Sequence, residues 1–170
     1  MGLMVLQDRI RRIAIYGALA VGLYTVENLL PTPLPWLRIG VANVAVVLAL
    51  TDLGLTAAAL VFLAKLILGS IITGRFLTPF FFFGAVGGVI ALGAMLLVWV
   101  LGRKVVSVVG ISVAGGVFHN IGQLLVARFA LIQSPALWRL LPVFIIIGVG
   151  TGTGIGIVAR LIQLRIKEYA

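Results

Sequence analysis

Long apolar runs, separated by short groups of proline, glycine and charged residues, recur along the whole chain. The runs are continuously apolar rather than alternating, which favours membrane-spanning helices over a membrane β-barrel. We predict six spans, approximately at residues 11–30, 39–52, 54–72, 79–101, 106–131 and 140–163. The second span has only about 14 residues, so it must be tilted, partly interfacial or buried among the other helices.

The breaks between these spans carry residues that interrupt helices. Three prolines lie between residues 31 and 35, and proline lacks the backbone donor and fixes φ. Asp52-Leu53-Gly54 predicts a tight turn, and Ser134-Pro135 marks the last long loop. We therefore expect a single integral membrane domain over residues 1–170, with no linker and no low-complexity tail.

The composition agrees with lipid as the solvent. Of the 170 residues, 62% are hydrophobic and 10% are charged, and the mean hydropathy is +1.28. Soluble globular chains carry about 45–50% apolar and about 25% charged residues. The absence of cysteine excludes disulfides, thiolate metal sites and cysteine nucleophiles. One histidine and four acidic residues leave little material for a metal site, and we expect none.

The basic residues predict the orientation of the chain. Eight of the thirteen lie at the N-terminus, after the fourth span and at the C-terminus: Arg9, Arg11, Arg12, Arg103, Lys104, Arg160, Arg165 and Lys167. The loops on the opposite face hold Arg38, Arg75 and Arg139. Because cytoplasmic loops are enriched in lysine and arginine, we place both termini in the cytoplasm and the chain in the cell membrane. The net charge of +9 then serves anchoring to anionic lipid, and no nucleic-acid partner is expected.

Most polar residues within the predicted spans fall in the outer half of the bundle. They are Glu27, Asn28, Arg38, Asn43, Lys65, His119, Asn120, Gln123 and Arg128, with Arg75 just beyond the third span. Their polar atoms cannot face lipid cheaply, so they should converge inward. The spacing of i and i+4 places His119 and Gln123 on one helical face, with Asn120 beside them.

This set holds four cations, from Arg38, Lys65, Arg75 and Arg128, against the carboxylate of Glu27. Arginine grips a carboxylate or phosphate through two hydrogen bonds, and lysine supplies a compact charge. The set therefore predicts a pocket, open to the outside, for an anionic or strongly polar small molecule. The alternative is a structural network, in which Glu27 pairs with Arg38 or Lys65 and the outer arginines reach lipid headgroups.

Two stretches of small residues indicate close helix packing. Ala14, Ala18 and Gly22 recur every four residues along the first span, which lets another backbone approach closely, from a partner or from a neighbouring span. The alternating glycines of residues 148–156 have a spacing like that of a nucleotide-binding loop. No strand precedes them and no Walker lysine follows, so we predict tight packing or a kink there instead.

Motifs on two different spans resemble one known family. Residues 35–43, Pro-Trp-Leu-Arg-Ile-Gly-Val-Ala-Asn, resemble the segment P-x-x-(K/R)-x-G-x-A-N of the Gx transporter family, which is also labelled heptaprenyl diphosphate synthase component I. Residues 110–123 resemble its second signature, G-x-S-x-x-G-x-x-x-H-N-x-G-Q. The resemblance spans essentially the whole chain.

That family is similar to the substrate-binding S-components of energy-coupling factor (ECF) transporters. The resemblance implies an S-component-like bundle that captures a vitamin or related nutrient from outside. It also implies docking, through the stripe of Ala14, Ala18 and Gly22, to a transmembrane module with two ATPases. The chain has no ATPase motif of its own, so ATP would be used by these partners, and we expect neither enzymatic activity nor a cofactor in this chain.

The leading hypothesis is therefore a binding subunit for uptake of a small anionic or polar molecule. Its predicted site residues are Glu27, Arg38, Asn43, Lys65, Arg75, His119, Asn120 and Gln123.

The second hypothesis is a membrane accessory subunit of polyprenyl diphosphate or quinone synthesis, with Arg38, Lys65 and Arg75 holding a diphosphate. The chain has no D-D-x-x-D motif for magnesium diphosphate, so autonomous prenyl transfer is not expected. A purely structural subunit would tolerate changes at His119 and Asn120. A proton-coupled transporter is disfavoured, because only Glu27 and His119 would titrate within the bundle.

Overall fold

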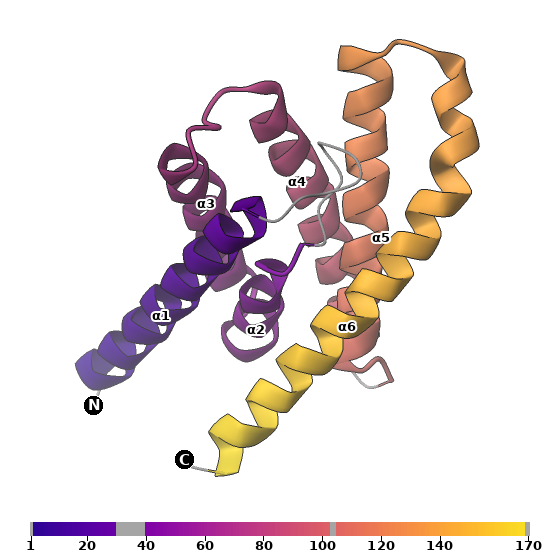
Figure 1. The fold of residues 1–170 in the computed structure, drawn as a ribbon. Helices are drawn as coiled ribbons and strands as arrows, with labels where there is room; N and C mark the ends of the chain where they lie inside the picture. The colour runs from indigo at the N-terminus through magenta and orange to yellow at the C-terminus, as the bar shows by residue number, and fades with distance from the viewer. Residues whose placement is uncertain (1, 30–39, 103–104, 169–170) are drawn as a thin grey trace.

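The computed structural model describes residues 2–29, 40–102 and 105–168, and the part of the chain that it describes contains helices and short turns but no strand (Figure 1). The main helices are α1 (Gly2–Leu29), α2 (Asn43–Leu53), α3 (Leu55–Ile72), α4 (Pro79–Leu101), α5 (Val108–Val126) and α6 (Leu141–Glu168). A π-helical turn, η1 (Ala127–Leu131), extends α5, and a 3-10 turn, η2 (Pro135–Leu140), leads into α6.

Each of the six predicted apolar runs corresponds to one of these helices. Four helical segments of the described chain are long and apolar enough to cross a membrane: Leu55–Ile72, Pro79–Leu101, Val108–Leu131 and Pro135–Ile166. The chain is therefore an all-α polytopic membrane protein. α1 has sufficient length, at 28 residues, but its first half carries several arginines, and α2 has only 11 residues.

Two predicted boundaries differ from the structure. α1 begins at Gly2 rather than near residue 11, because the arginine-rich start continues the same helix. The last loop is short rather than long, since only residues 132–134 are irregular. Pro135 begins η2, where its fixed φ suits the first helical position, and the Ser134 side chain accepts a hydrogen bond from the Ala136 N–H.

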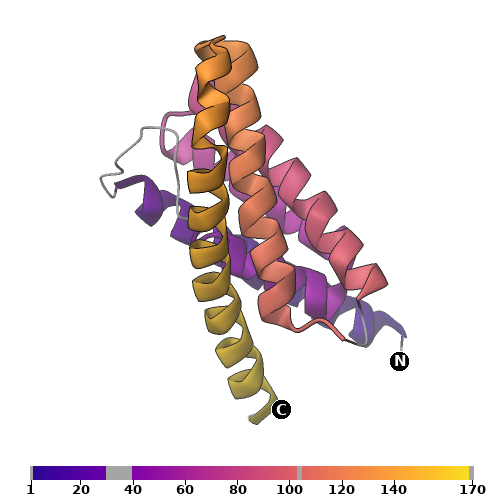
Figure 2. The ribbon, with the colours of Figure 1, turned by 90° about the vertical axis from the view of Figure 1, so that its right-hand side faces the viewer.

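The short helix α2 lies at the centre of the bundle. It contacts α1 and α3 on one side and α4, α5 and α6 on the other (Figures 1 and 2). All residues from Val44 to Leu50 are buried, as expected for a helix that is apolar on every face. Of the alternatives open for this segment, burial among the other helices is confirmed.

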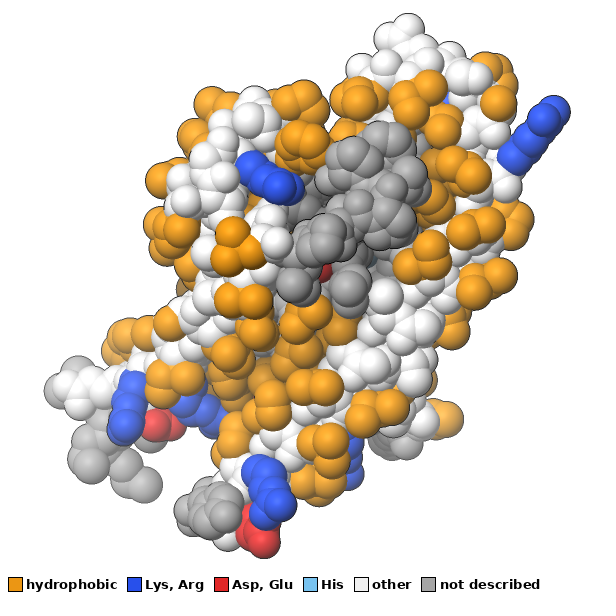
Figure 3. Space-filling model, in the orientation of Figure 1, with side chains coloured by type: hydrophobic (Ala, Val, Ile, Leu, Met, Phe, Trp, Pro, Cys, Tyr) orange, Lys and Arg blue, Asp and Glu red, His pale blue; other side chains and the backbone are white. Residues whose placement is uncertain are grey.

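Both chain termini lie at the same end of the bundle (Figure 1). Figure 3 shows apolar side chains spread over the visible face and several basic side chains near the two termini, with others toward the opposite end. The exposed arginines near the termini include Arg9 and Arg11 on α1 and Arg160 and Arg165 on α6. An apolar flank with a basic end is the distribution that the positive-inside rule describes.

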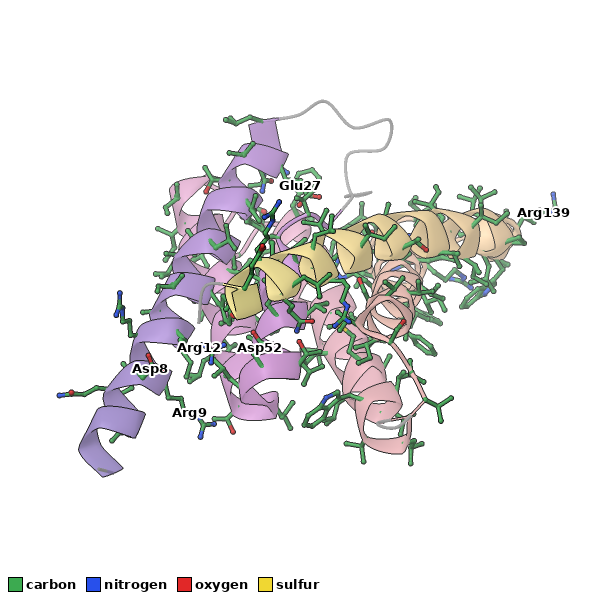
Figure 4. The ribbon with its side chains drawn as sticks, turned by 90° about the horizontal axis from the view of Figure 1, so that it is seen from below. Asp8, Arg9, Arg12, Glu27, Asp52 and Arg139 are labelled. Carbon is green, nitrogen blue, oxygen red and sulfur yellow. The ribbon has the colours of Figure 1, made fainter. Side chains whose placement is uncertain are left out.

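At this basic end, Asp52 joins three helices. Its Oδ2 accepts a hydrogen bond of 2.7 Å from the Tyr16 hydroxyl and lies 3.3 Å from the Arg12 guanidinium, both on α1 (Figure 4). Its Oδ1 accepts a hydrogen bond of 2.7 Å from the Gln163 amide on α6. The sequence alone assigned Asp52 only to a turn, but its carboxylate fixes the end of α2 between α1 and α6.

Alternate glycines of α6 allow its close contact with α5. A Cβ added at Gly148, Gly152 or Gly156 would lie 2.6–2.7 Å from a backbone Cα of α5. A Cβ at Gly150 or Gly154 would meet nothing within 4 Å. The predicted tight packing is confirmed, and three glycines spaced by four residues provide it.

We expect Gly152→Ala to destabilise the bundle by about 1–3 kcal/mol, because its methyl group would push the α5 and α6 backbones apart. Gly150→Ala is the matched control, since it makes the same change where there is open space. Equilibrium unfolding in mixed micelles measures both free energies. Equal stability of the two variants would contradict close backbone packing at Gly152.

Candidate ligand-binding site

Four helices bring polar side chains to one small cavity. Glu27 of α1, Asn43 of α2, Lys65 of α3 and His119 of α5 all line it. We call this space, of about 20 Å³, the polar cavity; its lining residues are Tyr24, Glu27, Gly40, Ala42, Asn43, Lys65, Leu66, Gly84 and His119. The prediction that the intramembrane polar groups converge inward is therefore correct for these four residues.

Lys65 is the basic residue that lines the polar cavity in the described part of the chain. Its side chain is only 6% exposed, and its Nζ donates a hydrogen bond of 2.6 Å to Asn43 Oδ1. The Nζ also lies 5.5 Å from the centre of the Phe62 ring, a distance at which the ring face attracts a cation. Burial of an ammonium group costs free energy, and these two contacts offset part of that cost.

Glu27 supplies the acidic group of the polar cavity. It is 6% exposed, and its carboxylate accepts a hydrogen bond from the backbone N–H of Gly40. The Gly40 carbonyl in turn accepts a hydrogen bond of 2.8 Å from the Asn43 N–H. Figure 4 shows Glu27 near the opposite end of α1 from Asp8, Arg9 and Arg12. Gly40 therefore connects the carboxylate to the first residue of α2.

A second space, the core cavity, lies among α2, α4, α5 and α6. It measures about 10 Å³ and is lined by Asn43, Val47, Met95, Ser112, Gly115, Gly116, His119, Asn120, Thr151 and Ile155. Asn43 and His119 line both cavities. Each volume has room for about one water molecule, so the structure presents the site in a closed form.

The three residues predicted to cluster on α5 make two kinds of contact. His119 and Gln123 share a face as expected, with 3.1 Å between their Nε2 atoms. Gln123 is fully buried, and its Oε1 has no hydrogen-bond partner among the described residues. Asn120 donates a hydrogen bond of 3.0 Å to the Phe144 carbonyl of α6. Asn120 thus joins two helices as well as lining the core cavity.

The structure does not bring every predicted cation to the polar cavity. Arg75 lies in the connection before α4, and its guanidinium is 5.1 Å from the centre of the Phe80 ring. Arg128 lies on η1, with its guanidinium 5.2 Å from the Phe129 ring centre. Neither residue lines the polar cavity, and Arg38 is outside the described residues. Among the described residues, the charged groups that line the cavity are Glu27 and Lys65, one of each sign.

The predicted docking stripe lies on the surface. Ala14, Ala18 and Gly22 are exposed and line an apolar groove between α1 and α3, which we call the α1–α3 groove. α1 contacts α3 through other residues. The Tyr24 ring of α1 packs against Gly69 of α3, where an added Cβ would lie 2.5 Å from the Tyr24 Cδ1 atom. A Cβ added at Gly22 would meet nothing within 4 Å, so this part of the stripe leaves open space, and docking of a partner there stays a prediction.

Sequence reasoning missed Gly40 and Tyr24 as parts of the site. Gly40 lies at φ +79°, a conformation that glycine adopts readily and other residues adopt at a cost. The available signal was the position of Gly40 in the turn that precedes α2, where a positive φ is common for glycine. Tyr24 is one turn before Glu27 on the same face of α1, a spacing that would have placed it at the same cavity.

Comparisons with known proteins identify a family for most of the chain. A family model described as heptaprenyl diphosphate synthase component I matches residues 16–162. The matched range includes every residue that lines the polar cavity and the core cavity. No curated protein and no solved structure matches the chain.

We expect Gly40→Ala to disturb the polar cavity, because its Cβ would lie 2.9 Å from the Asn43 Nδ2 atom. Gly74→Ala is the matched control: Gly74 also has a positive φ, of +66°, but open space around the added methyl group. Both changes should cost about 1–2 kcal/mol for the backbone conformation, measured by unfolding. Only Gly40→Ala should shift the side-chain amide signal of Asn43 in NMR spectra; a shift in both variants or in neither would contradict the contact.

Proposed function

The chain belongs to the heptaprenyl diphosphate synthase component I family, and we propose that it is the substrate-binding subunit of an ECF-type transporter. In this role it captures a small polar nutrient from outside the cell membrane of a prokaryote. Partner subunits then use ATP to drive uptake. The observation that carries the proposal is the convergence of Glu27, Asn43, Lys65 and His119 on one cavity within a membrane bundle.

Buried charge supports a binding role over a structural one. Ionisable residues within membrane helices are expensive to keep, and they commonly mark substrate pathways. Glu27 and Lys65 come from different helices, α1 and α3, and their side chains are held by different neutral groups, the Gly40 N–H and the Asn43 amide. Both charged groups therefore border the cavity from separate walls, where they can contact a bound molecule.

Binding requires the site to open. Small-molecule pockets commonly measure about 300–1,000 Å³, far more than the polar cavity. The hydrogen bond between Lys65 and Asn43 crosses from α3 to α2, so an oxygen of the ligand can replace Asn43 Oδ1 as the acceptor. Capture would then separate the start of α2 from α3.

The α1–α3 groove supports a membrane partner. It is apolar, and small residues of α1 leave room for the backbone of another helix to approach. The groove does not overlap the residues that line the polar cavity. A transmembrane partner that carries the ATPases can therefore dock on α1 while the ligand stays enclosed.

The description of the family favours a second candidate, a membrane accessory subunit of heptaprenyl diphosphate synthesis. A diphosphate in the polar cavity would meet Lys65 but also the carboxylate of Glu27, which opposes its negative charge. Co-purification with a soluble prenyl synthase, together with loss of long-chain product on deletion of this chain, would favour this candidate over uptake.

We expect Lys65→Met to reduce retention of the bound small molecule, since it removes the buried ammonium while keeping an unbranched side chain. The measurement is mass spectrometry of metabolites released from the purified protein. Arg139→Ala is the control, because Arg139 is exposed and lies far from Glu27 (Figure 4). The loss should be on the order of tenfold or more. Equal ligand content in both variants would rule out Lys65 as a binding residue.

We expect Ala18→Leu to block docking of the partner without changing ligand retention, because the larger side chain fills the α1–α3 groove. Gly150→Leu makes a similar change on the exposed face of α6 and is the matched control. ATP-dependent uptake in cells that express the partner module should fall only in Ala18→Leu. Normal uptake by that variant would show that partners dock elsewhere.

A further inference from the structure

We infer that the polar cavity selects a zwitterion, a small molecule that carries one anionic and one cationic group, as in an amino acid. This inference rests on the proposed binding function and deepens it by assigning the class of substrate. It narrows the anionic or strongly polar molecule that the sequence predicts, because the charged groups that line the cavity among the described residues are one of each sign.

One wall of the polar cavity suits an anionic group. Lys65 Nζ points to Asn43 Oδ1 at 2.6 Å, so a carboxylate that replaces this amide oxygen gains a charge-assisted hydrogen bond. Asn43 is also the first residue of α2, and the residue before it has no side-chain cap. The positive end of the α2 dipole therefore reinforces the attraction of Lys65 for an anion.

The other wall suits a cationic group. Glu27 is nine-tenths buried, and its carboxylate is oriented by the Gly40 N–H at the edge of the cavity. An ammonium group of the ligand would face this carboxylate, and the Tyr24 ring and the His119 imidazole also line the cavity between α1 and α5. A positive charge is attracted by both a carboxylate and an aromatic face.

The balance of charge argues against polyanions. The two described charged groups at the cavity sum to zero, and a zwitterion keeps that sum unchanged. A diphosphate would bring two or more negative charges beside Glu27, in surroundings where unpaired charge is strongly penalised. A simple carboxylate would leave Glu27 without a cationic partner from the ligand.

The test uses calorimetry on the purified chain in lipid nanodiscs. The probes are a panel of amino acids and related amino carboxylates, the matching carboxylic acids without the amine, the matching amines without the carboxylate, and inorganic diphosphate. We expect the best zwitterion to bind on the order of 30-fold or more tightly than either of its one-charge analogues. Diphosphate should bind no better than these analogues.

Two isosteric variants assign each end of the ligand. Glu27→Gln should lose the preference for the zwitterion over the acid without the amine, and Lys65→Met should lose the preference over the amine without the carboxylate. If the two residues had a purely structural role, both changes would instead weaken the binding of every probe to the same extent. If either variant fails to fold, the affinities of the unchanged protein for the zwitterion and its analogues decide the question.

The outcomes separate this inference from the proposed function. Tighter binding of diphosphate or of a one-charge analogue overturns the zwitterion assignment. If no zwitterion binds but another molecule co-purifies in a Lys65-dependent manner, the zwitterion assignment is overturned. The proposed binding function stands in that case. If no small molecule binds at all, both proposals fall.

Discussion

The structure depends on one constraint of the bilayer: a polar group within the hydrocarbon region must find its partner inside the protein. Lys65 meets this constraint through Asn43, Glu27 through the backbone of Gly40, and Asn120 through the carbonyl of Phe144. Each of these contacts joins two segments that are distant in sequence. The same interactions that satisfy the polar groups therefore hold the helices around the polar cavity and place α2 at the centre.

Close backbone approach makes this enclosure possible. Lipid tails are as apolar as leucine side chains, so helices in a membrane associate through packing and hydrogen bonds rather than through burial from water. Gly148, Gly152 and Gly156 bring α6 against α5, and a Cβ at Gly87 of α4 would lie 2.9 Å from the His119 carbonyl. Glycines on α4 and α6 thus hold α5 from two sides, which fixes the positions of His119 and Asn120.

Two groups of described charged residues differ in their exposure to solvent. Near the termini, Arg9 and Arg11 are exposed, and Arg12 pairs with Asp52; these groups remain within reach of water, where charge is inexpensive. At the other end, Glu27 and Lys65 are buried. Their burial in spite of its free-energy cost is the feature that supports the proposed binding site.

The sequence alone determined the number of helices, the membrane class, the family and the inward convergence of Glu27, Asn43, Lys65 and His119. Hydrophobicity and the cost of exposing polar groups to lipid act locally, so a linear pattern records them. The tertiary structure decided which of the described cations reach the cavity, that Asp52 joins three helices, and that Ala14, Ala18 and Gly22 line an open groove. Those outcomes depend on how helices rotate and cross, which glycine packing and interhelical hydrogen bonds set between residues far apart in the chain.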